Sequence, residues 1–394
     1  PSTPLTRNMA QIHMKTARSS ATDPKAVADE LLDQLGPTNP KLVTLFASRE
    51  RDQRALNAAV RERLGKETRL FGATSAREID NGGMHDDTVV LGALEGDFEV
   101  GIGLGTSVSD DALGAGAAAM KTACEQLGSR PQDLDLSRHV GIVIDDGYRY
   151  KKEELLMGAL SKNQGLILVG GGASTPEQDP AKQSSELHVD GEVATDSFLV
   201  AMIKTDAPFA ALRHHAYSPT GQSVTITKVS DDGNCALEID GKPAAQRYAD
   251  LLGVGIDELE FGLPKGFAQK PLALKVGREY FLRSPWKPLP DGSVMFANLL
   301  EEDSTYELMQ LGDMAALTDE YMTKVIPERV PNPTAALHFH CAGRQWLAEN
   351  MGSSAALAEA FTKGPPCVGL NVFFEMYCGF HINTTLTSLV FGSK

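Results

Sequence analysis

Short apolar runs alternate with amphipathic segments along the first hundred residues. Leu42–Ser48 is an apolar run of strand length, and Arg49–Leu64 carries apolar residues at the three- and four-residue spacing of a helix. Arg69–Ser75 is a second apolar run that ends in small polar residues. Thr88–Leu94 and Phe98–Ile102, separated by a Glu-Gly-Asp turn, predict a β-hairpin, and an alanine-rich helix is expected after it.

The same order of elements returns twice, which indicates an internal repeat of domain-sized units. The second copy comprises His139–Ile144, Lys152–Leu160, Leu166–Ser174, and a predicted hairpin of Ser197–Ile203 with Phe209–His214. A third, looser copy comprises Ala335–Cys341, Gln345–Thr362, and the strands Val368–Tyr377 and Asn383–Phe391, which are expected to pair. We interpret Pro271–Gly312 as a degenerate fourth copy.

This pattern predicts an α/β fold of repeated βαβ-hairpin units. Crossovers mixed with hairpins imply mixed sheets with helices on one face. Sheets with one face to cover would pack together, so we expect α-β-β-α layers. A domain boundary is predicted near residue 215, which gives an N-terminal domain over 1–215 and a C-terminal domain over 216–394.

Charge and composition narrow the classes of partner. The formal net charge is −15, and no long Lys/Arg run interrupts the acidic surface. Phosphate backbones and anionic lipids would repel such a chain, so nucleic acid and membrane surfaces are poor partners. No apolar stretch approaches the roughly 18 residues that a membrane span requires. Pro1–Met14 holds no apolar run, so no signal peptide is predicted.

The cysteines argue against a zinc ribbon or a disulfide framework. There are five, an odd number, at irregular spacings and without a CxxC pair. Reduced thiols in a cytoplasmic protein fit best.

Three glycine-rich segments are candidate binding elements. Gly101–Gly105 lacks the third glycine of a dinucleotide motif, since Thr106 stands there, and nucleotide binding is disfavoured. Gly72–Ala76, which contains Thr74 and Ser75, and Gly170–Gly172 end predicted strands, where α/β folds commonly bind ligands. A tight strand-to-loop turn explains these glycines equally well.

The segment Leu337–Arg344 is the densest cluster of reactive side chains. On a strand, His338 and His340 point to one face, so they could ligate a metal or a haem iron, or could be hydrogen-bonded core residues. Arg344 comes just after the strand, where its guanidinium could bind a carboxylate. Cys341 is interpreted as a packed structural thiol.

A second cluster spans Phe374–Thr385. Glu375 and Tyr377 share one strand face, and Cys378 and His381 lie three residues apart. A Cys–His nucleophile requires a thiolate held against an imidazole, and proximity in sequence does not supply that geometry. His214-His215 is interpreted as a solvated strand end.

Together these segments resemble the FIST family. Met14–Leu35 looks like the start of a FIST N-terminal domain, and Phe71–Ile79 is similar to its "GCSTAGEI"-like segment, with Ala73 and Arg77 as departures. Cys341 and Arg344 match the Cys-x-x-Arg of the C-terminal domain. Its "GFxxxGE" strand and its "N-x-T" correspond to Gly369–Glu375, with Phe374 in place of glycine, and to Asn383–Thr385.

The resemblance implies a sensory protein that binds a small ligand, such as an amino acid, and is not an enzyme. Stand-alone bacterial members also resemble nitric-oxide sensors that bind haem and regulate a histidine kinase or a cyclic-di-GMP enzyme. We expect a pocket between the two halves. The predicted ligand-binding residues are Arg344, Glu375, Thr74, Ser75 and Tyr377, and the haem-ligand candidates are His340 and His338. A sensor without haem and a cysteine-dependent enzyme remain alternatives.

Overall fold

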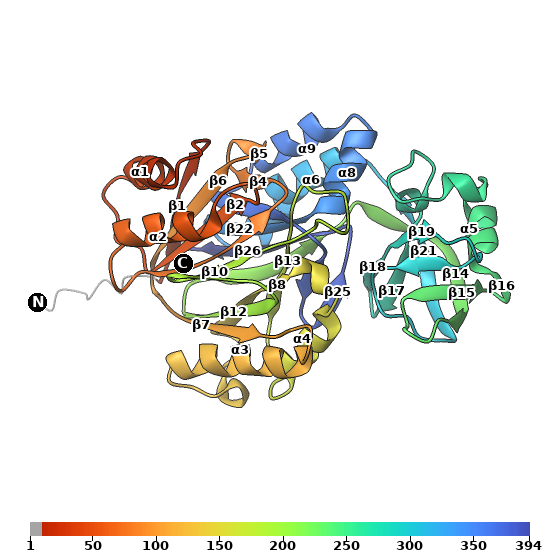
Figure 1. The fold of residues 1–394 in the computed structure, drawn as a ribbon, viewed down its shortest axis with the longest axis horizontal. Helices are drawn as coiled ribbons and strands as arrows, with labels where there is room; N and C mark the ends of the chain where they lie inside the picture. Colours follow the sequence, from red (N-terminus) through yellow and green to blue (C-terminus); the bar gives the residue numbers. More distant parts are fainter. Residues whose placement is uncertain (1–9) are drawn as a thin grey trace, which may run out of the picture.

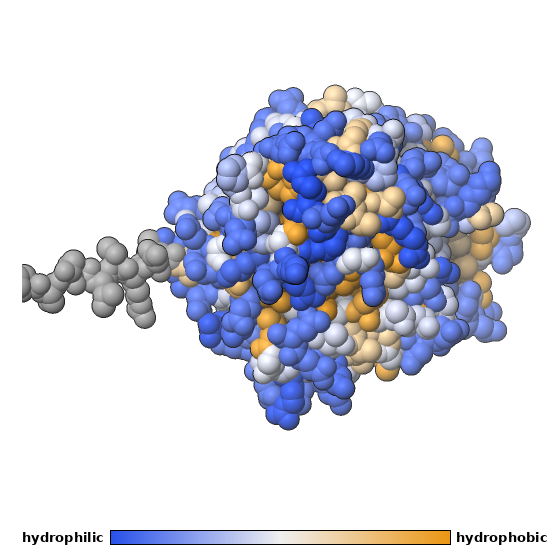
Figure 2. Space-filling view, turned by 60° about the vertical axis from the view of Figure 1, so that its left-hand side comes forward, coloured by the Kyte–Doolittle hydropathy of each residue, from blue (hydrophilic) through white to orange (hydrophobic). Residues whose placement is uncertain are grey.

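Three sheets surround one core, and a fourth forms a separate lobe (Figure 1). The computed structural model describes residues 10–394; the first nine residues of the predicted Pro1–Met14 segment lie outside it. One face of the molecule is mainly hydrophilic with small hydrophobic areas (Figure 2), as the strong negative charge leads one to expect. Within residues 10–394, no helix has the length and apolarity to cross a membrane.

The first repeat forms most of the first sheet. Asp23 caps its first helix by accepting a hydrogen bond from the amide of Ala26. Its elements are β1 (Ile12–Ser19), α1 (Pro24–Leu35), β2 (Leu42–Ser48), α2 (Gln53–Arg63), β3 (Arg69–Ser75), β4 (Glu78–Asp80), β5 (Gly83–His85) and β6 (Val89–Gly96).

The second repeat has the same order of elements and forms most of the second sheet. They are β7 (Phe98–Thr106), α3 (Ala112–Gln126), β8 (His139–Asp146), α4 (Lys152–Leu160), β9 (Leu168–Ala173), β10 (Leu187–Val189), β11 (Glu192–Ala194) and β12 (Ser197–Thr205).

The third repeat forms most of the third sheet, and a large insertion follows its first strand. Its elements are β13 (Phe209–His214), α6 (Met314–Glu320), a π-helical turn (Tyr321–Val325), α7 (Ile326–Arg329), β22 (Pro333–Cys341), α8 (Ala342–Asn350), α9 (Ser354–Phe361), β23 (Cys367–Val372), β24 (Glu375–Tyr377), β25 (Phe380–Ile382) and β26 (Leu386–Gly392).

The insertion, residues 217–311, is called the inserted domain below. It folds into the fourth sheet with one helix packed on it. Its elements are β14 (Tyr217–Val229), β15 (Cys235–Ile239), β16 (Lys242–Pro243), α5 (Ala244–Leu252), β17 (Leu272–Val276), β18 (Glu279–Arg283), β19 (Pro285–Pro288), β20 (Val294–Phe296) and β21 (Ser304–Leu311). The predicted degenerate fourth copy, Pro271–Gly312, is wrong, because its strands belong to this sheet.

The repeats exchange their short hairpins in a ring. Hairpin β4–β5 of the first repeat pairs with β23 in the third sheet. Hairpin β10–β11 of the second repeat pairs with β3 in the first sheet. Hairpin β24–β25 of the third repeat pairs with β9 in the second sheet. Each sheet is therefore completed by a neighbouring repeat.

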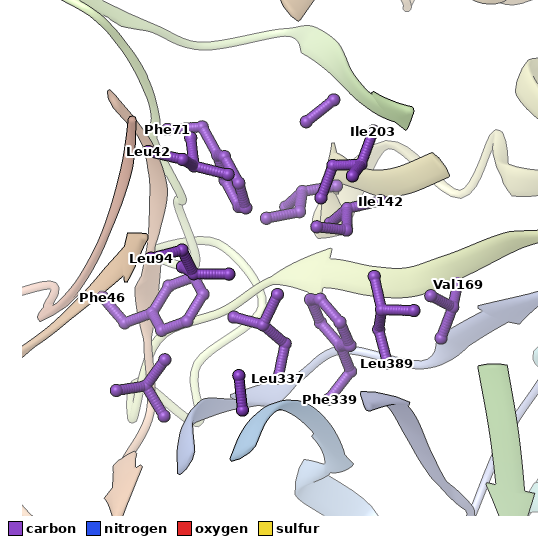
Figure 3. Packing of buried hydrophobic residues seen from close by; sticks show 14 of the residues in the cluster. Leu42, Phe46, Phe71, Leu94, Ile142, Val169, Ile203, Leu337, Phe339 and Leu389 are labelled. Atoms are coloured by element: carbon purple, nitrogen blue, oxygen red, sulfur yellow. The ribbon is translucent and has the colours of Figure 1, made fainter. Parts of the chain in front are cut away.

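The core lies where the inner faces of the three sheets meet. Leu42, Phe71, Ile142, Leu337 and Leu389 point toward one another there (Figure 3) and are fully buried. Helices cover the outer face of each sheet. The predicted α/β class, with mixed sheets and outer helices, is confirmed. Two layers of sheet were expected, and a third sheet closes the core.

Glycine occupies the same register position in all three repeats. Gly72, Gly170 and Gly369 lie opposite Leu45, Val143 and His338 on the adjacent parallel strand. A Cβ at these glycines would lie 1.9, 1.7 and 2.4 Å from the carbonyl oxygens of those partners. Close backbone packing thus requires glycine within these strands, and it accounts for Gly72 and Gly170 without a ligand.

Both long hairpins predicted from the sequence are wrong. Strands β6 and β7 lie in different sheets, and so do β12 and β13. The turn residues Glu95–Asp97 carry the chain from one repeat to the next, with Gly96 at φ 126°. Turn residues in the sequence predict that the chain reverses direction, but they do not predict which strand the next strand pairs with.

Two predicted elements of the third repeat are divided. The strand Val368–Tyr377 breaks at Phe374, which has φ 67°, so that Glu375 and Tyr377 enter the second sheet. Strand β26 pairs with β22 and β13, not with β23 as expected. The helix predicted over Gln345–Thr362 is two helices, because Gly352 at φ 69° ends the first.

Candidate functional site

A polar layer lies between the outer face of the third sheet and its helices. We define it by Arg344, Thr318, Tyr321, His214, His338 and His340. Both β22 histidines point outward, as predicted from their spacing, while Leu337 and Phe339 point into the central core. Phe361 of α9 packs edge-on against the two imidazoles, with ring centroids 5.5 and 5.4 Å away. The polar and titratable side chains of the layer thus lie beneath α9.

Arg344 is the most unusual member of the polar layer. It lies in the first turn of α8 with 1% of its surface exposed. Its Nη2 donates to the hydroxyl of Thr318 at 2.7 Å. Neither Nε nor Nη1 has a hydrogen-bond partner within residues 10–394. Burial lowers the pKa of Arg344 to about 10, so it remains a cation at neutral pH. An unpaired buried cation is costly, and a bound anion would offset that cost.

Both β22 histidines are neutral and each has one free ring nitrogen. Burial lowers the pKa of His338 to about 3 and holds that of His340 well below its usual range. His340 donates from Nδ1 to Oδ1 of Asn371 at 3.1 Å, and Nδ1 of His338 lies 2.8 Å from the hydroxyl of Ser388. In the part of the chain that the structure describes, their Nε2 atoms have no partner. Nε2 of His340 is therefore an unused acceptor.

Tyr321 and His214 complete the layer; Tyr321 was missed at the level of sequence, and His214 was not expected to belong to a site. The ring of Tyr321 stacks on His214, with centroids 4.8 Å apart. His214 is partly buried and contacts Thr318, so the predicted solvated strand end is not found. Tyr321 begins the π-helical turn, a distortion often found at functional sites. The hydroxyl of Tyr321 has no partner among the described residues.

Glu375 lies beside the polar layer rather than within it. One of its carboxyl oxygens accepts from the amide and the hydroxyl of Thr385, at 3.0 and 2.7 Å. Burial raises the pKa of Glu375 to about 8, despite the charge of Arg344 nearby. Cys341 is buried between them, and burial raises the pKa of its thiol. A mainly protonated Glu375 leaves the charge of Arg344 without a full counter-ion.

The other predicted binding residues make hydrogen bonds elsewhere. Thr74 accepts from the amide of Glu186 at 3.0 Å, and Ser75 donates to Glu78 at 2.9 Å. Tyr377 is partly buried on β24 and donates to the carbonyl of Ala211 at 3.1 Å. The structure brings Arg344, His338 and His340 together with Glu375 adjacent, and places Thr74, Ser75 and Tyr377 outside the polar layer.

The Cys378–His381 pair does not have the arrangement of a nucleophile and its base. Nδ1 of His381 lies 2.8 Å from the carboxylate of Glu153, and no hydrogen bond joins it to Cys378 among residues 10–394. Burial raises the pKa of Cys378, so it is mainly a thiol at neutral pH.

Counterparts of Arg344 in the other repeats are paired with aspartate. Arg51, Arg149 and Arg344 each follow the end of the corresponding strand by three residues. Arg51 contacts Oδ1 of Asp87 at 2.5 Å, and Arg149 contacts Oδ1 of Asp196 at 3.2 Å.

The third repeat lacks that aspartate. One register position holds Asp87, Asp196 and Thr384 in the three repeats. Each lies two residues before the first residue that pairs with β2, β8 or β22, namely Val89, Phe198 and Leu386. Their φ angles are 54°, 48° and 55°. The neutral Thr384 thus stands where the other repeats place a carboxylate. The equal spacing after each strand was a signal in the sequence that we did not use.

Comparison with known families decides the relationship. Residues 41–242 match the FIST N domain, and residues 244–378 match the FIST C domain. The chain belongs to the FIST family. FIST domains are small-ligand sensory domains of signalling proteins, which is the context for the polar layer. The two FIST matches meet inside the inserted domain, and the domain boundary near residue 215 stays a prediction.

Other relatives of this FIST protein add little about function. An uncharacterized protein of Methanocaldococcus jannaschii is 28% identical over 120 residues, which cover 30% of this chain. The matched region spans only 22% of that relative.

Similarity to solved structures is weak. A cyanuric acid hydrolase aligns with 98% of this chain and all of its own, at 8% identity and a TM-score of 0.37. The cyanuric acid hydrolase from A. caulinodans aligns at 10% identity, covering 98% of this chain and 99% of its own, with a TM-score of 0.34. These values support no transfer of activity.

The polar layer does not fit a haem in this arrangement. Neutral histidines with free Nε2 atoms suit an iron ligand. A porphyrin beside them would nevertheless have to displace Phe361 and α9, which pack against both rings. Two surface hollows, of about 810 and 390 Å³, lie on the inserted domain and between α3 and α4, and neither is lined by a polar-layer residue.

Proposed function

We propose that this FIST protein is a sensor for a small carboxylate, such as an amino acid, bound in the polar layer by Arg344. One observation carries the proposal: Arg344 is a fully buried cation whose counterparts pair with aspartate, whereas it bonds only to a neutral hydroxyl. The ligand's carboxylate would supply the missing negative charge. Nε2 of His340 would accept a hydrogen bond from an amino or hydroxyl group of the ligand.

Regulation of a signalling partner is part of this proposal. The family resemblance implies a histidine kinase or a cyclic-di-GMP enzyme as that partner, and a cytoplasmic setting. Catalysis is not proposed, because Cys378 and His381 do not form a reactive pair.

Thermal shift and titration calorimetry test the proposal with acetate, propionate, L-alanine and L-glutamate. A compound that binds only the native state must raise the melting temperature. We expect at least one of the four to do so with the wild-type chain, and the effect to vanish in Arg344→Gln. Arg51→Gln is the matched control and should keep the response. No shift with any of the four compounds, or an equal shift in Arg344→Gln, would contradict the proposal.

An absorption spectrum with added haemin tests the alternative. The free Nε2 atoms of His338 and His340 are the observation in its favour. A sharp stoichiometric Soret band that is lost in His340→Ala or His338→Ala would support haem, and would show that α9 can open. A spectrum without such a band would exclude the haem alternative, and the carboxylate proposal would remain.

A further inference from the structure

The chain passes between the body of the molecule and the inserted domain through one pair of strands, called the neck below (Figure 1), while side chains of the inserted domain also pack against β25 and the loop before β26. The two strands of the neck are the start of β14 and the end of β21, paired from Tyr217 with Leu311 to Pro219 with Met309. At its base, the amide of Gly312 donates to the carbonyl of Ala216 at 2.8 Å. A register shift between Pro219 and Ser223 interrupts the ladder just beyond. A short ladder followed by a bulge is a natural place for bending.

Both strands of this neck continue directly into the polar layer. On one side, β14 begins three residues after His214, which stacks on Tyr321. On the other side, β21 leads through Gly312 and Asp313 into α6, which carries Thr318. Thr318 is the hydrogen-bond partner of Arg344 and also contacts His214. Thr318 is therefore linked to both strands of the neck, through α6 on one side and through His214 on the other.

Stacked tryptophans form one of the side-chain contacts between the inserted domain and the body. Trp346 lies on α8, two residues after Arg344, and Trp286 lies on β19 of the inserted domain. Their ring centroids are 6.3 Å apart, and Phe261 of the inserted domain packs against both. The chain contains only these two tryptophans. One helix thus carries both the cation of the polar layer and a contact to the inserted domain.

A π-helical turn provides an element that can switch between arrangements. Tyr321–Val325 connects α6 to α7 without a break in the helix. A π turn holds one residue more than an α-helical turn, so moving it along the helix rotates and shifts the residues before it. Those residues include Thr318. Discrete alternatives of this kind can carry coupling between sites.

We infer that the inserted domain is the output arm of the sensor, and that its setting relative to the body is fixed by the state of the polar layer. Binding at Arg344 changes the contact to Thr318, resets α6 and its π turn, and moves the neck. This inference rests on the proposed function for the input that it transmits, but the mechanical coupling can be tested without any ligand.

Hydrogen–deuterium exchange of the full-length chain measures the coupling. Thr318→Val removes only the hydroxyl that Arg344 contacts, and Arg344→Gln removes the charge. Both should change amide exchange in the neck and in β15 or β17 of the inserted domain by about tenfold, a typical size for coupling between sites. Arg51→Gln, the matched control in the first repeat, should leave exchange in the inserted domain unchanged.

Tryptophan emission gives an independent readout. Trp286→Phe leaves Trp346 as the reporter, and Trp346→Phe leaves Trp286. Thr318→Val should shift the emission of Trp286, which lies in the inserted domain, whereas Thr318 lies in the body of the molecule. Unaltered emission from Trp286, together with exchange changes confined to α6 and α8, would overturn the inference. That result would leave the carboxylate proposal intact, and the absence of carboxylate binding would leave this coupling intact.

Discussion

Arg51 in the first repeat and Arg344 in the third occupy equivalent positions with opposite consequences. Arg51 contacts the side chain of Asp87 and donates to its carbonyl oxygen, so its charge is satisfied within its own repeat. Arg344 is also buried, but the neutral Thr384 occupies the register position of Asp87 in its repeat, and Arg344 bonds only to Thr318. A repeated fold thus keeps a structural ion pair in one copy, while loss of a single carboxylate makes the same cation available in another.

The largest expected difference is in the stability of the two arginine-to-methionine variants. Arg51→Met removes charge-assisted hydrogen bonds and should destabilise the chain by about 2 kcal/mol. Arg344→Met removes an unpaired buried charge and should be neutral or stabilising by about 1 kcal/mol. Urea unfolding without added carboxylate measures both. Equal destabilisation by the two substitutions would mean that Arg344 is as well satisfied as Arg51.

A second test supplies the missing carboxylate. Thr384 occupies in the third repeat the register position that Asp87 occupies in the first, and its hydroxyl lies 2.8 Å from that of Ser284. Thr384→Asp should pair with Arg344 and stabilise the ligand-free chain by about 1.5 kcal/mol, the contribution of a charged hydrogen bond. It should also abolish carboxylate binding in calorimetry. Thr384→Asn is the neutral control; if it behaved like the aspartate variant, charge would not be the cause.

A buried carboxyl pair offers a third, smaller comparison between the same repeats. Glu78 accepts from the amide and hydroxyl of Thr88, as Glu375 does from Thr385. Burial raises the pKa of each carboxyl from 4.5 to about 8. Because the folded pKa lies above the unfolded one, the contribution of each carboxyl to stability should be fully present below pH 4.5 and should be lost as pH rises through about 8.

Glutamine variants test that pH dependence. In Glu78→Gln and Glu375→Gln, the fall in unfolding free energy between pH 5 and 8 should become shallower, by less than about 1 kcal/mol per pH unit for each group. Denaturant unfolding across that range measures the slope. Glu67→Gln, which removes an exposed carboxylate, is the control. Slopes as steep as in the wild type would mean that the glutamates are ionised when folded.

Local elements of this fold could be predicted from sequence, and their pairing could not. Apolar runs such as Leu42–Ser48 predict a strand, because a strand that is buried on both faces needs apolar residues at successive positions. The partner of a strand depends on residues far along the chain: β4–β5 pairs with a strand nearly three hundred residues later. The same limit explains why Glu375 was expected in one strand with Val368 and is found on β24, beside β9.

The candidate site followed the same rule. Alternation along β22 correctly placed His338 and His340 on one face, and Arg344 lies just beyond that strand as expected. Thr318, Tyr321 and His214 come from segments separated from β22 by the inserted domain or by α7, so no local pattern connected them to it. Only the repeat, compared position by position, would have identified Thr384 as the exceptional residue.

The exchange of hairpins has a consequence for synthesis on the ribosome. The first sheet can be complete once residue 194 has emerged, because its last strand is β11. The second sheet must wait for β25 and the third for β26, at the end of the chain. Hairpin β4–β5, made early, has no partner until β23 is synthesised. Much of the nascent chain must therefore wait, with its central apolar faces uncovered, for the final sixty residues to arrive.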